Sequence, residues 1–287
     1  MTSLVRGGYV LTLSCADVPG IVAAVAAHLA SLGCNITDSQ QFGDPDPGTF
    51  FMRVAFTAPD TLDPATLDDG FAPVAEPFAM TWRLSDSRRR IRTVLMVSRF
   101  GHCLNDLLFR CSIGALPIDI AAVVSNHTEF ERLAGNYDVP FVHIPVSTAS
   151  KDVAELQLRA ILADRDIDLV VLARYMQVLS DGLCTDYDGR IINIHHSMLP
   201  SFKGARPYHQ AYDRGVKFVG ATAHYVTAAL DEGPIIEQEI ARIDHSMSAD
   251  DVVALGRDME NVALARAVRW HAENRVLRNG ARTVVFT

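Results

Sequence analysis

Short apolar runs separated by polar turns cover the first 85 residues and predict a small α+β unit. Strand-like runs occur at residues 9–14, 35–42, 50–56 and 80–84. In the third run Phe50, Met52, Val54 and Phe56 recur with the period of two that a half-buried strand shows. Helical patterns at residues 21–32 and 61–78, the second interrupted by Pro73, lie between the strands. The predicted order is βαββαβ, a ferredoxin-like sheet with helices on one face.

Beyond residue 92 the pattern changes to apolar strands that alternate with helices. Such strands are predicted at residues 93–97, 118–124, 141–144, 169–172 and 191–194, followed by two more at residues 218–226 and 235–243. Near-continuous apolar strands joined by helices predict an α/β fold with a buried, mostly parallel, Rossmann-like open sheet. A long helix at residues 248–275 begins with Ser248 and Asp251 at the spacing of a capping box. Residues 282–286 form a candidate edge strand.

The two patterns divide the chain into a small domain at residues 1–85, a linker at residues 86–92 and a larger domain at residues 93–287. The linker carries four arginines, at positions 88, 89, 90 and 92. Its simplest interpretation is a solvated joint between the domains. The alternative is a basic patch for an anionic ligand or RNA.

The composition is that of a globular protein, with 49% of the 287 residues hydrophobic and 21% charged. The net charge of −8 argues against a nucleic-acid partner, because such proteins usually carry a basic face. The five cysteines form no Cys-x-x-Cys pair, so neither a disulfide framework nor a thiolate zinc site is expected. A reducing, cytoplasmic compartment is therefore expected. The apolar stretches are too short to cross a bilayer and the N-terminus lacks a signal-peptide pattern, so no membrane partner is expected.

The polar residues most suggestive of chemistry lie at the end of the strand at residues 191–194. Side chains two apart in a strand point to the same face, so Asn193 and His195 are expected to project together. Ligands of open parallel sheets bind beyond the carboxyl ends of the strands. There an amide can stabilise an oxyanion, an imidazole can move protons, and Asp231 can orient His195 or a water. Taken alone, the same residues also fit a hydrogen-bonded strand end and an ordinary turn.

Three other candidates are weaker. Arg206, in the loop before a helix expected to begin at Pro207, can bind an anionic group or simply belong to the loop. The histidines lack carboxylate and thiolate partners at zinc-like spacing, so no metal is expected. Cys103 is a candidate nucleophile, but the adjacent His102 would point away from it on a helix, which favours a packing role for Cys103.

Several motifs together resemble the formyltetrahydrofolate-dependent formyltransferase superfamily. Its signature is Asn-x-His-x-Ser-(Leu/Met)-Leu-Pro, followed by a Gly-x-Thr-x-His segment and an Asp-x-Gly loop. The matching runs are INIHHSMLP at residues 192–200, GATAH at residues 220–224 and LDEGPIIEQ at residues 230–238. The chain is closely similar to the deformylase branch of this superfamily, through GARPYHQAY at residues 204–212, HCL at residues 102–104 and SNH at residues 125–127.

The resemblance implies hydrolysis of 10-formyltetrahydrofolate to formate and tetrahydrofolate, which supplies formate for one-carbon and purine metabolism. The catalytic residues it implies are Asn193, His195 and Asp231. The substrate-binding residues it implies are Arg174, Met176, Val178, Leu179, Gly233 and Pro234. Supporting roles are implied for His196, Ser197, Arg206, Thr222 and His224. No metal or other cofactor is implied. Without the resemblance, residues 176–179 fit the packed start of a helix.

The acceptor of the formyl group distinguishes the branches of the superfamily. Glycinamide ribonucleotide formyltransferases hold the phosphate of their acceptor in a glycine-rich loop after the first strand of the domain, where backbone N–H groups approach the anion. In this chain the same loop has the single glycine Gly101 between the bulky Phe100 and His102, which favours water as the acceptor. Transfer to an amine remains the alternative, and a non-catalytic amino-acid sensor is a third hypothesis.

The N-terminal unit resembles an ACT domain, through the turn that precedes its first helix and through the segment after that helix. ACT domains bind amino acids at a dimer interface, and a helix N-terminus favours a carboxylate. The resemblance therefore implies an effector site at Asp17, Pro19, Gly20 and Asn35, with glycine or methionine as candidate effectors. The alternative is an oligomerisation module without a ligand. In either case a homo-oligomer, a dimer or a tetramer, is expected.

Overall fold

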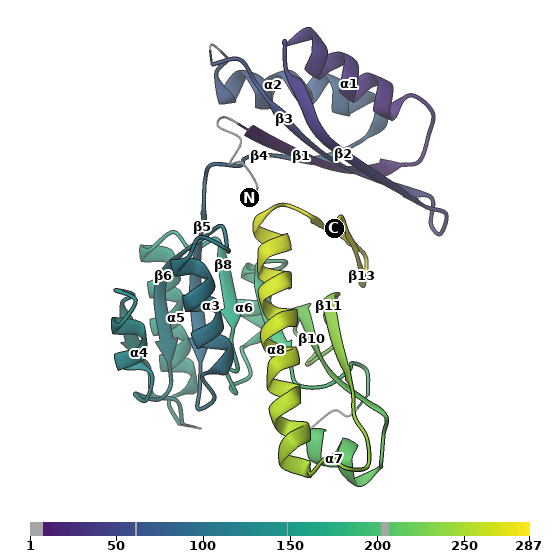
Figure 1. Ribbon diagram of the computed structural model, residues 1–287. Helices are drawn as coiled ribbons and strands as arrows, with labels where there is room; N and C mark the ends of the chain where they lie inside the picture. Colours follow the sequence, from purple (N-terminus) through teal and green to yellow (C-terminus); the bar gives the residue numbers. More distant parts are fainter. Residues whose placement is uncertain (1–7, 61, 148, 202–206) are drawn as a thin grey trace. The chain divides into compact units, whose positions relative to one another are not determined.

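The computed structural model describes residues 8–60, 62–147, 149–201 and 207–287, which form two compact units (Figure 1). The first unit contains the described residues up to Arg90 together with Glu273–Asn279 and Val284–Thr287. The second unit contains Ile91–Ala272 and Gly280–Thr283. Among the described residues, no helix has the length and apolar character needed to span a membrane.

The first unit contains a four-stranded antiparallel sheet in the spatial order β2-β3-β1-β4. The strands are β1 (Gly8–Ala16), β2 (Asn35–Asp44), β3 (Thr49–Thr57) and β4 (Thr81–Asp86). The helices are α1 (Ile21–Ser31) and α2 (Pro64–Ala75), and a 3₁₀ turn, η1 (Glu76–Phe78), follows α2. Both helices cover one face of the sheet (Figure 1). The predicted βαββαβ order is confirmed.

Helix α2 continues through Pro73, although the sequence pattern predicts an interruption there. A proline removes one helical hydrogen bond, yet the helix is held by Leu67, Phe71 and Ala75, which are all buried in the core of the unit. Asp63 caps the helix by accepting a hydrogen bond from the backbone N–H of Ala65. Tertiary packing here outweighs the local preference of the proline.

The second unit is built around a seven-stranded sheet in the order β11-β10-β9-β8-β5-β6-β7. The strands are β5 (Ile91–Val97), β6 (Ile118–Ser125), β7 (Phe141–His143), β8 (Leu169–Leu172), β9 (Ile191–His195), β10 (Phe218–Tyr225) and β11 (Ile235–Arg242). Strands β5 to β9 are parallel, whereas β10 runs antiparallel to both of its neighbours. The expected mostly parallel, Rossmann-like sheet is confirmed. Because the chain leaves β5 in one direction toward β6 and β7 and returns to β8 on the other side, the strand order reverses between β5 and β8.

The helices of the second unit are α3 (His102–Ser112), α4 (Glu131–Gly135), α5 (Lys151–Asp164), α6 (Asp181–Asp186), α7 (Pro207–Asp213) and α8 (Ala249–Ala272). The predicted capping box of α8 is present. The Ser248 backbone N–H donates to the Asp251 carboxylate at 2.8 Å, and the Asp251 N–H donates to the Ser248 hydroxyl at 3.2 Å.

The C-terminal segment differs from the sequence-based expectation. Helix α8 ends at Ala272, and a two-stranded sheet of β12 (Val276–Asn279) and β13 (Arg282–Val285) follows. The buried Arg53 donates to the carbonyl oxygen of Glu273 at 3.1 Å, which ties this segment to the first unit. Sequence periodicity cannot show such a contact, because its partners are 220 residues apart. The boundary between the units, at Arg90 and Ile91, lies within the expected linker at residues 86–92, although β4 and β5 leave only residues 87–90 between them. The expected extent of the larger domain, to residue 287, differs, because Glu273–Asn279 and Val284–Thr287 belong to the first unit.

Candidate active site

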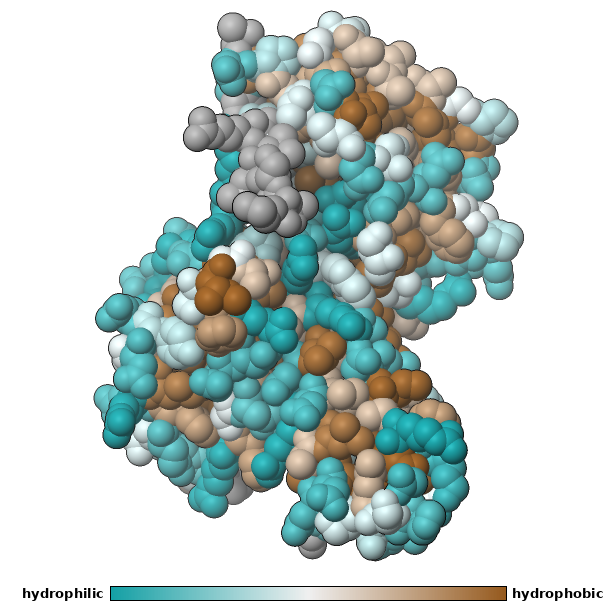
Figure 2. Space-filling model, in the orientation of Figure 1, coloured by the Kyte–Doolittle hydropathy of each residue, from teal (hydrophilic) through white to brown (hydrophobic). Residues whose placement is uncertain are grey.

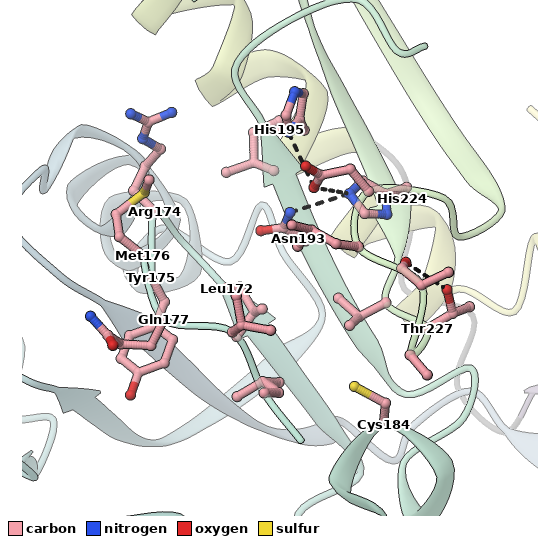
Figure 3. A pocket seen from close by; sticks show the side chains of 18 of the residues that line it. Leu172, Arg174, Tyr175, Met176, Gln177, Cys184, Asn193, His195, His224 and Thr227 are labelled. Atoms are coloured by element: carbon pink, nitrogen blue, oxygen red, sulfur yellow. Dashed lines mark hydrogen bonds and ion pairs between the residues drawn. The ribbon is translucent and has the colours of Figure 1, made fainter. Parts of the chain in front are cut away.

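The pairing of β9 with β10 brings the polar residues of the two strands together. In this antiparallel register Asn193 lies opposite His224, and His195 lies opposite Thr222. The Asn193 amide nitrogen is 3.2 Å from His224 Nε2. His224 Nδ1 in turn bonds to the carbonyl oxygen of Tyr225 at 2.8 Å, which fixes the orientation of the ring. The expected projection of Asn193 and His195 to a common site is observed (Figure 3).

Asp231 reaches this site from the connection between β10 and β11. Its backbone is left-handed, with φ 57°. Gly233 lies against the backbone of Tyr225, where a β-carbon would stand only 1.7 Å from the carbonyl oxygen, so only glycine fits this close approach. The folded-back loop places the Asp231 carboxylate 3.2 Å from His195 Nδ1 and 3.8 Å from His224 Nε2 (Figure 3).

The electrostatics of the site follow from this arrangement. The hydrogen bond from His195 lowers the pKa of Asp231, against the effect of burial, so the carboxylate is charged at neutral pH. Burial lowers the pKa of His224, which favours a neutral ring. Because Asp231 occupies Nδ1 of His195, the other ring nitrogen, Nε2, is left buried and without a hydrogen-bond partner among the described residues.

A pocket of about 340 Å³ opens next to Asn193, His195 and Asp231. One wall is the segment after β8, from Arg174 to Leu179, and another is formed by residues 226–231. Met176 and Val178 line the pocket and each exposes more than half of its surface, so this wall offers apolar area to a ligand. The wall is fixed to the neighbouring strand β5: the Ser98 N–H donates to the Arg174 carbonyl oxygen at 3.1 Å, and the Met176 N–H donates to the Ser98 hydroxyl at 3.0 Å.

The other candidate residues occupy different places. Arg174, Met176, Val178, Leu179, His196 and His224 line the pocket, whereas Gly233 and Pro234 do not and instead pack and bond against Tyr225. Ser197 and Thr222 are buried behind the site. Thr222 Oγ1 donates to the Ser197 carbonyl oxygen and accepts from the N–H of Leu199 and from Gln238, so it holds the loop that follows β9. Arg206 lies outside the described residues.

In the first unit, the candidate effector residues form an exposed turn. Asp17, Pro19 and Gly20 precede helix α1, and Gly20 is left-handed with φ 101°. Asn35, at the start of the edge strand β2, is exposed as well.

A buried charged cluster centred on Glu260 was not predicted from the sequence. Its carboxylate accepts hydrogen bonds from His102 Nε2 at 2.8 Å and from the Tyr208 hydroxyl at 3.0 Å, and it lies 3.4 Å from the Arg174 guanidinium. These bonds lower the pKa of Glu260 against a strong burial effect. Glu260 follows Val252 and Gly256 at intervals of four residues on α8. The sequence signal that could have indicated this cluster is therefore an acidic residue in the apolar stripe of a helix.

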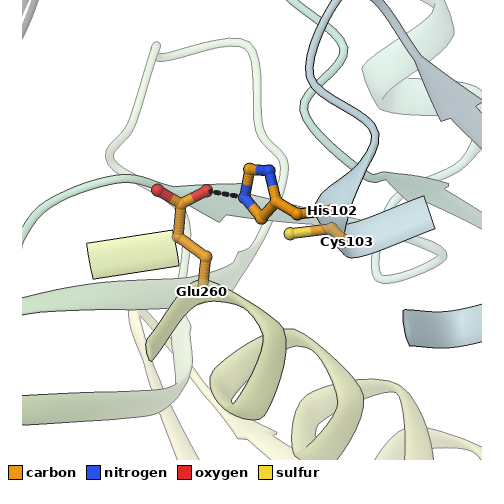
Figure 4. Close-up of side chains that lie close together, drawn as sticks. All are labelled: His102, Cys103 and Glu260. Atoms are coloured by element: carbon orange, nitrogen blue, oxygen red, sulfur yellow. Dashed lines mark hydrogen bonds and ion pairs between the residues drawn. The ribbon is translucent and has the colours of Figure 1, made fainter. Parts of the chain in front are cut away.

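Part of the same cluster is a candidate for a metal site in this chain. Among the described residues, His102, Cys103 and Glu260 form the one group of His, Cys and acidic ligand atoms that lie within 4.8 Å of one another (Figure 4). The Glu260 oxygens are already hydrogen-bonded, and Arg174 supplies a positive charge beside them. Burial and Glu260 raise the pKa of the Cys103 thiol, so a thiolate ligand or nucleophile is disfavoured there. The cluster fits a packed hydrogen-bond network better than a metal site.

Comparison with known proteins agrees with this architecture. The Formyl transferase family matches residues 91–268, and the ACT domain family matches residues 9–66. A formyltetrahydrofolate deformylase of Corynebacterium sp. (strain P-1) is 50% identical over 281 residues, covering 97% of this chain and 98% of the relative. The crystal structure of formyltetrahydrofolate deformylase from Burkholderia mallei is 48% identical with a TM-score of 0.93, covering 98% of this chain and 100% of that structure.

A more distant neighbour matches a smaller share of the chain. The structure of glycinamide ribonucleotide transformylase 1 from Symbiobacterium toebii is 32% identical with a TM-score of 0.64, and it covers 69% of this chain and 95% of that structure. Deformylases, in contrast, match both units at nearly full length. The chain belongs to the formyltetrahydrofolate deformylase family, with an N-terminal ACT domain and a formyltransferase-like domain.

Proposed function

We propose that Asn193, His195 and Asp231 carry the hydrolysis of 10-formyltetrahydrofolate to formate and tetrahydrofolate in the pocket beside β9. The observation that carries this assignment is their convergence. An amide and an imidazole from strand β9 and a carboxylate from the connection between β10 and β11 meet at one pocket of about 340 Å³. Asp231 is charged and bonds to Nδ1 of His195, and the other nitrogen of that ring, Nε2, has no partner among the described residues.

In the proposed mechanism a water attacks the formyl carbon and gives a tetrahedral intermediate. The Asn193 amide donates a hydrogen bond to the developing oxyanion. His195 stabilises the same charge through Nε2, while Asp231 accepts from Nδ1 and stabilises the positive charge that the ring gains on protonation. Collapse of the intermediate breaks the bond from carbon to the folate nitrogen. One water proton ends on that nitrogen, and the other is lost from the formic acid.

The proposed folate site lies along the apolar wall of the pocket. Met176, Val178 and Leu179 present apolar surface, and the backbone of this segment is held in place by Ser98. A flat pterin ring buries apolar faces while its polar edge bonds to backbone groups. This role rests on the family resemblance and on the exposure of Met176 and Val178.

Water is favoured over an amine as the acceptor, and no step of the scheme needs a metal or another cofactor. The segment after β5 does not offer a glycine-rich phosphate cradle. His102 is bonded to Glu260, and the Phe100 ring stacks with Arg174, whose guanidinium carbon is 5.4 Å from the ring centroid.

The test is the product balance of the purified chain with 10-formyltetrahydrofolate in ¹⁸O-labelled water. We expect formate and tetrahydrofolate in equal amounts and one solvent oxygen in each formate, with no change in formate yield when glycinamide ribonucleotide is added. Formylated amine in place of formate would support the transferase alternative. No turnover under either condition would leave the amino-acid sensor hypothesis.

For the first unit, we propose a regulatory role as an ACT domain that binds an amino acid such as glycine or methionine. The exposed turn at Asp17–Gly20 precedes a helix of 11 residues, whose N-terminal dipole suits a carboxylate. Calorimetric titration of the full chain with each amino acid tests this. Binding that is lost in Asp17→Ala would support the effector site, and no binding of either amino acid would favour the oligomerisation module.

A further inference from the structure

The Arg174 side chain is a buried cation that the proposed hydrolytic steps do not use. Only 9% of its side-chain surface is accessible, and the residue lines the pocket. Its backbone is left-handed, with φ 68°, a conformation that non-glycine residues adopt at an energetic cost. The guanidinium Nε and Nη1 atoms are buried and have no hydrogen-bond partner among the described residues.

Glu260 supplies a negative charge beside Arg174, but it does not accept a hydrogen bond from the Nε or Nη1 atom of the guanidinium. The Nη1 atom lies 3.4 Å from Glu260 Oε2, an ion-pair distance outside good hydrogen-bond geometry. His102 and Tyr208 already donate to the two Glu260 oxygens, at 2.8 and 3.0 Å. The bidentate pairing that arginine usually makes with a carboxylate is therefore not formed. Arg174 keeps donors for a second carboxylate.

His195, which also lines this pocket, has another ring nitrogen without a partner. Its Nε2 atom is buried and unpartnered, as described above. Figure 3 shows Arg174 and His195 on neighbouring walls, on the segment after β8 and at the end of β9. His196 lies within electrostatic reach of both: burial first, then the charges of Arg174 and His195, lower its pKa to about 4.

We infer that Arg174 and His195 Nε2 form a subsite for one small carboxylate, the formate that hydrolysis releases. This inference rests on the proposed function. Addition of water to the formyl group and cleavage of its carbon–nitrogen bond give formic acid, which loses its proton near neutral pH and becomes an anion. Transfer to an amine would give a neutral amide instead. A buried cation with free donors in the lining of the same pocket therefore suits the hydrolytic product.

Inhibition by added formate tests the subsite. We expect formate to inhibit the wild-type chain, and Arg174→Gln to raise the inhibition constant for formate about tenfold to a hundredfold, as expected for loss of a charge-assisted contact. Arg174→Lys keeps the charge and should lose less. Arg257→Gln is the matched control, because Arg257 is an exposed arginine whose guanidinium carbon is 5.8 Å from the centroid of the same Phe100 ring. It should leave the constant within about twofold.

A second measurement needs no turnover. Titration of ¹³C-formate into the folate-free chain, followed by the NMR line width of formate, should show binding in the wild type and Arg257→Gln but not in Arg174→Gln. Equal formate binding, or an equal inhibition constant, in the wild type and Arg174→Gln would overturn the subsite even if hydrolysis proceeds. Arg174-dependent formate binding without hydrolysis would uphold the subsite and refute the proposed function. Absence of formate binding to the wild type would also overturn the subsite.

Discussion

At the scale of single residues, Asp231 controls the charge of the site. Its carboxylate contacts His195 at 3.2 Å and His224 at 3.8 Å, and the bond from His195 lowers its pKa. One carboxylate thus lies beside two imidazoles, of which His195 has a second ring nitrogen that is buried and has no hydrogen-bond partner among the described residues.

Asp231→Asn removes this charge while keeping the size of the side chain. We expect turnover to fall by about 10²–10³-fold, because His195 loses the group that orients its ring and stabilises its positive charge. Folate affinity should change little. The rate constant of a single turnover and the dissociation constant for tetrahydrofolate, measured on the same preparation, separate the two effects. A variant that only binds folate more weakly would make Asp231 a pocket residue.

His196 gives a prediction for stability against pH. Its pKa is about 4 in the folded chain, against an ordinary value of 6.5. Between these values the unfolded chain binds more protons, so the free energy of unfolding falls as the pH drops from 6.5 to 4. His196→Gln should reduce this fall, by at most ~1.4 kcal/mol per pH unit. Urea denaturation at several pH values checks it. A difference between variant and wild type that is the same at every pH would contradict the prediction.

At the scale of elements, the connection from β10 to β11 positions Asp231 through a close backbone contact. Gly233→Ala would place a β-carbon 1.7 Å from the Tyr225 carbonyl oxygen, so the loop must move. We expect a loss of about 2–4 kcal/mol in the free energy of unfolding and a drop in kcat/KM of at least about tenfold, because Asp231 moves with the loop.

Gly135→Ala is the matched control for Gly233→Ala. No atom lies within 4 Å of the β-carbon it would add, so its stability should change by less than about 0.5 kcal/mol. Denaturant titrations and steady-state kinetics of both variants test the pair. Normal kinetics in Gly233→Ala would show that the loop does not depend on this contact.

The positions of the strands along the chain were the feature of the fold that the sequence predicted best. Apolar runs located each strand of both main sheets to within a few residues, because buried parallel strands and alternating half-buried strands have distinct patterns. The period of two also predicted that Asn193 and His195 share a face. The contact of Asp231 with His195 could be suggested from the residue types and from the resemblance, but the pattern could not locate it, since it depends on a left-handed turn and on residues 36 positions apart. The Glu260 cluster was missed, because its partners come from α3, α7 and the segment after β8.

At the scale of the whole molecule, the first unit offers a surface for self-association. Its edge strand β2 and the region around α1 carry the exposed apolar residues Val18, Val22, Ile36 and Phe42. Figure 2 shows apolar patches among polar groups on the visible face of this unit. Exposed strand edges and apolar surface are typical of sheets that pair across a two-fold axis.

Val22→Glu places a charge on this surface and should lower the molar mass measured by light scattering, because a buried unpaired charge opposes association. Val153→Glu is the control, since Val153 is an exposed valine on helix α5 of the second unit. It should leave the mass unchanged. An equal mass for Val22→Glu and the wild type would argue against this face as the interface.

The direct test of the central claim is Asn193→Ala, with turnover and folate binding measured on one preparation. Loss of a preorganised oxyanion donor costs about 3 kcal/mol, so the rate of formate release should fall about 10²–10³-fold while the dissociation constant for tetrahydrofolate stays within about threefold. Release of formate at close to the wild-type rate would exclude Asn193 from the mechanism and contradict the convergence of three groups on one formyl carbon.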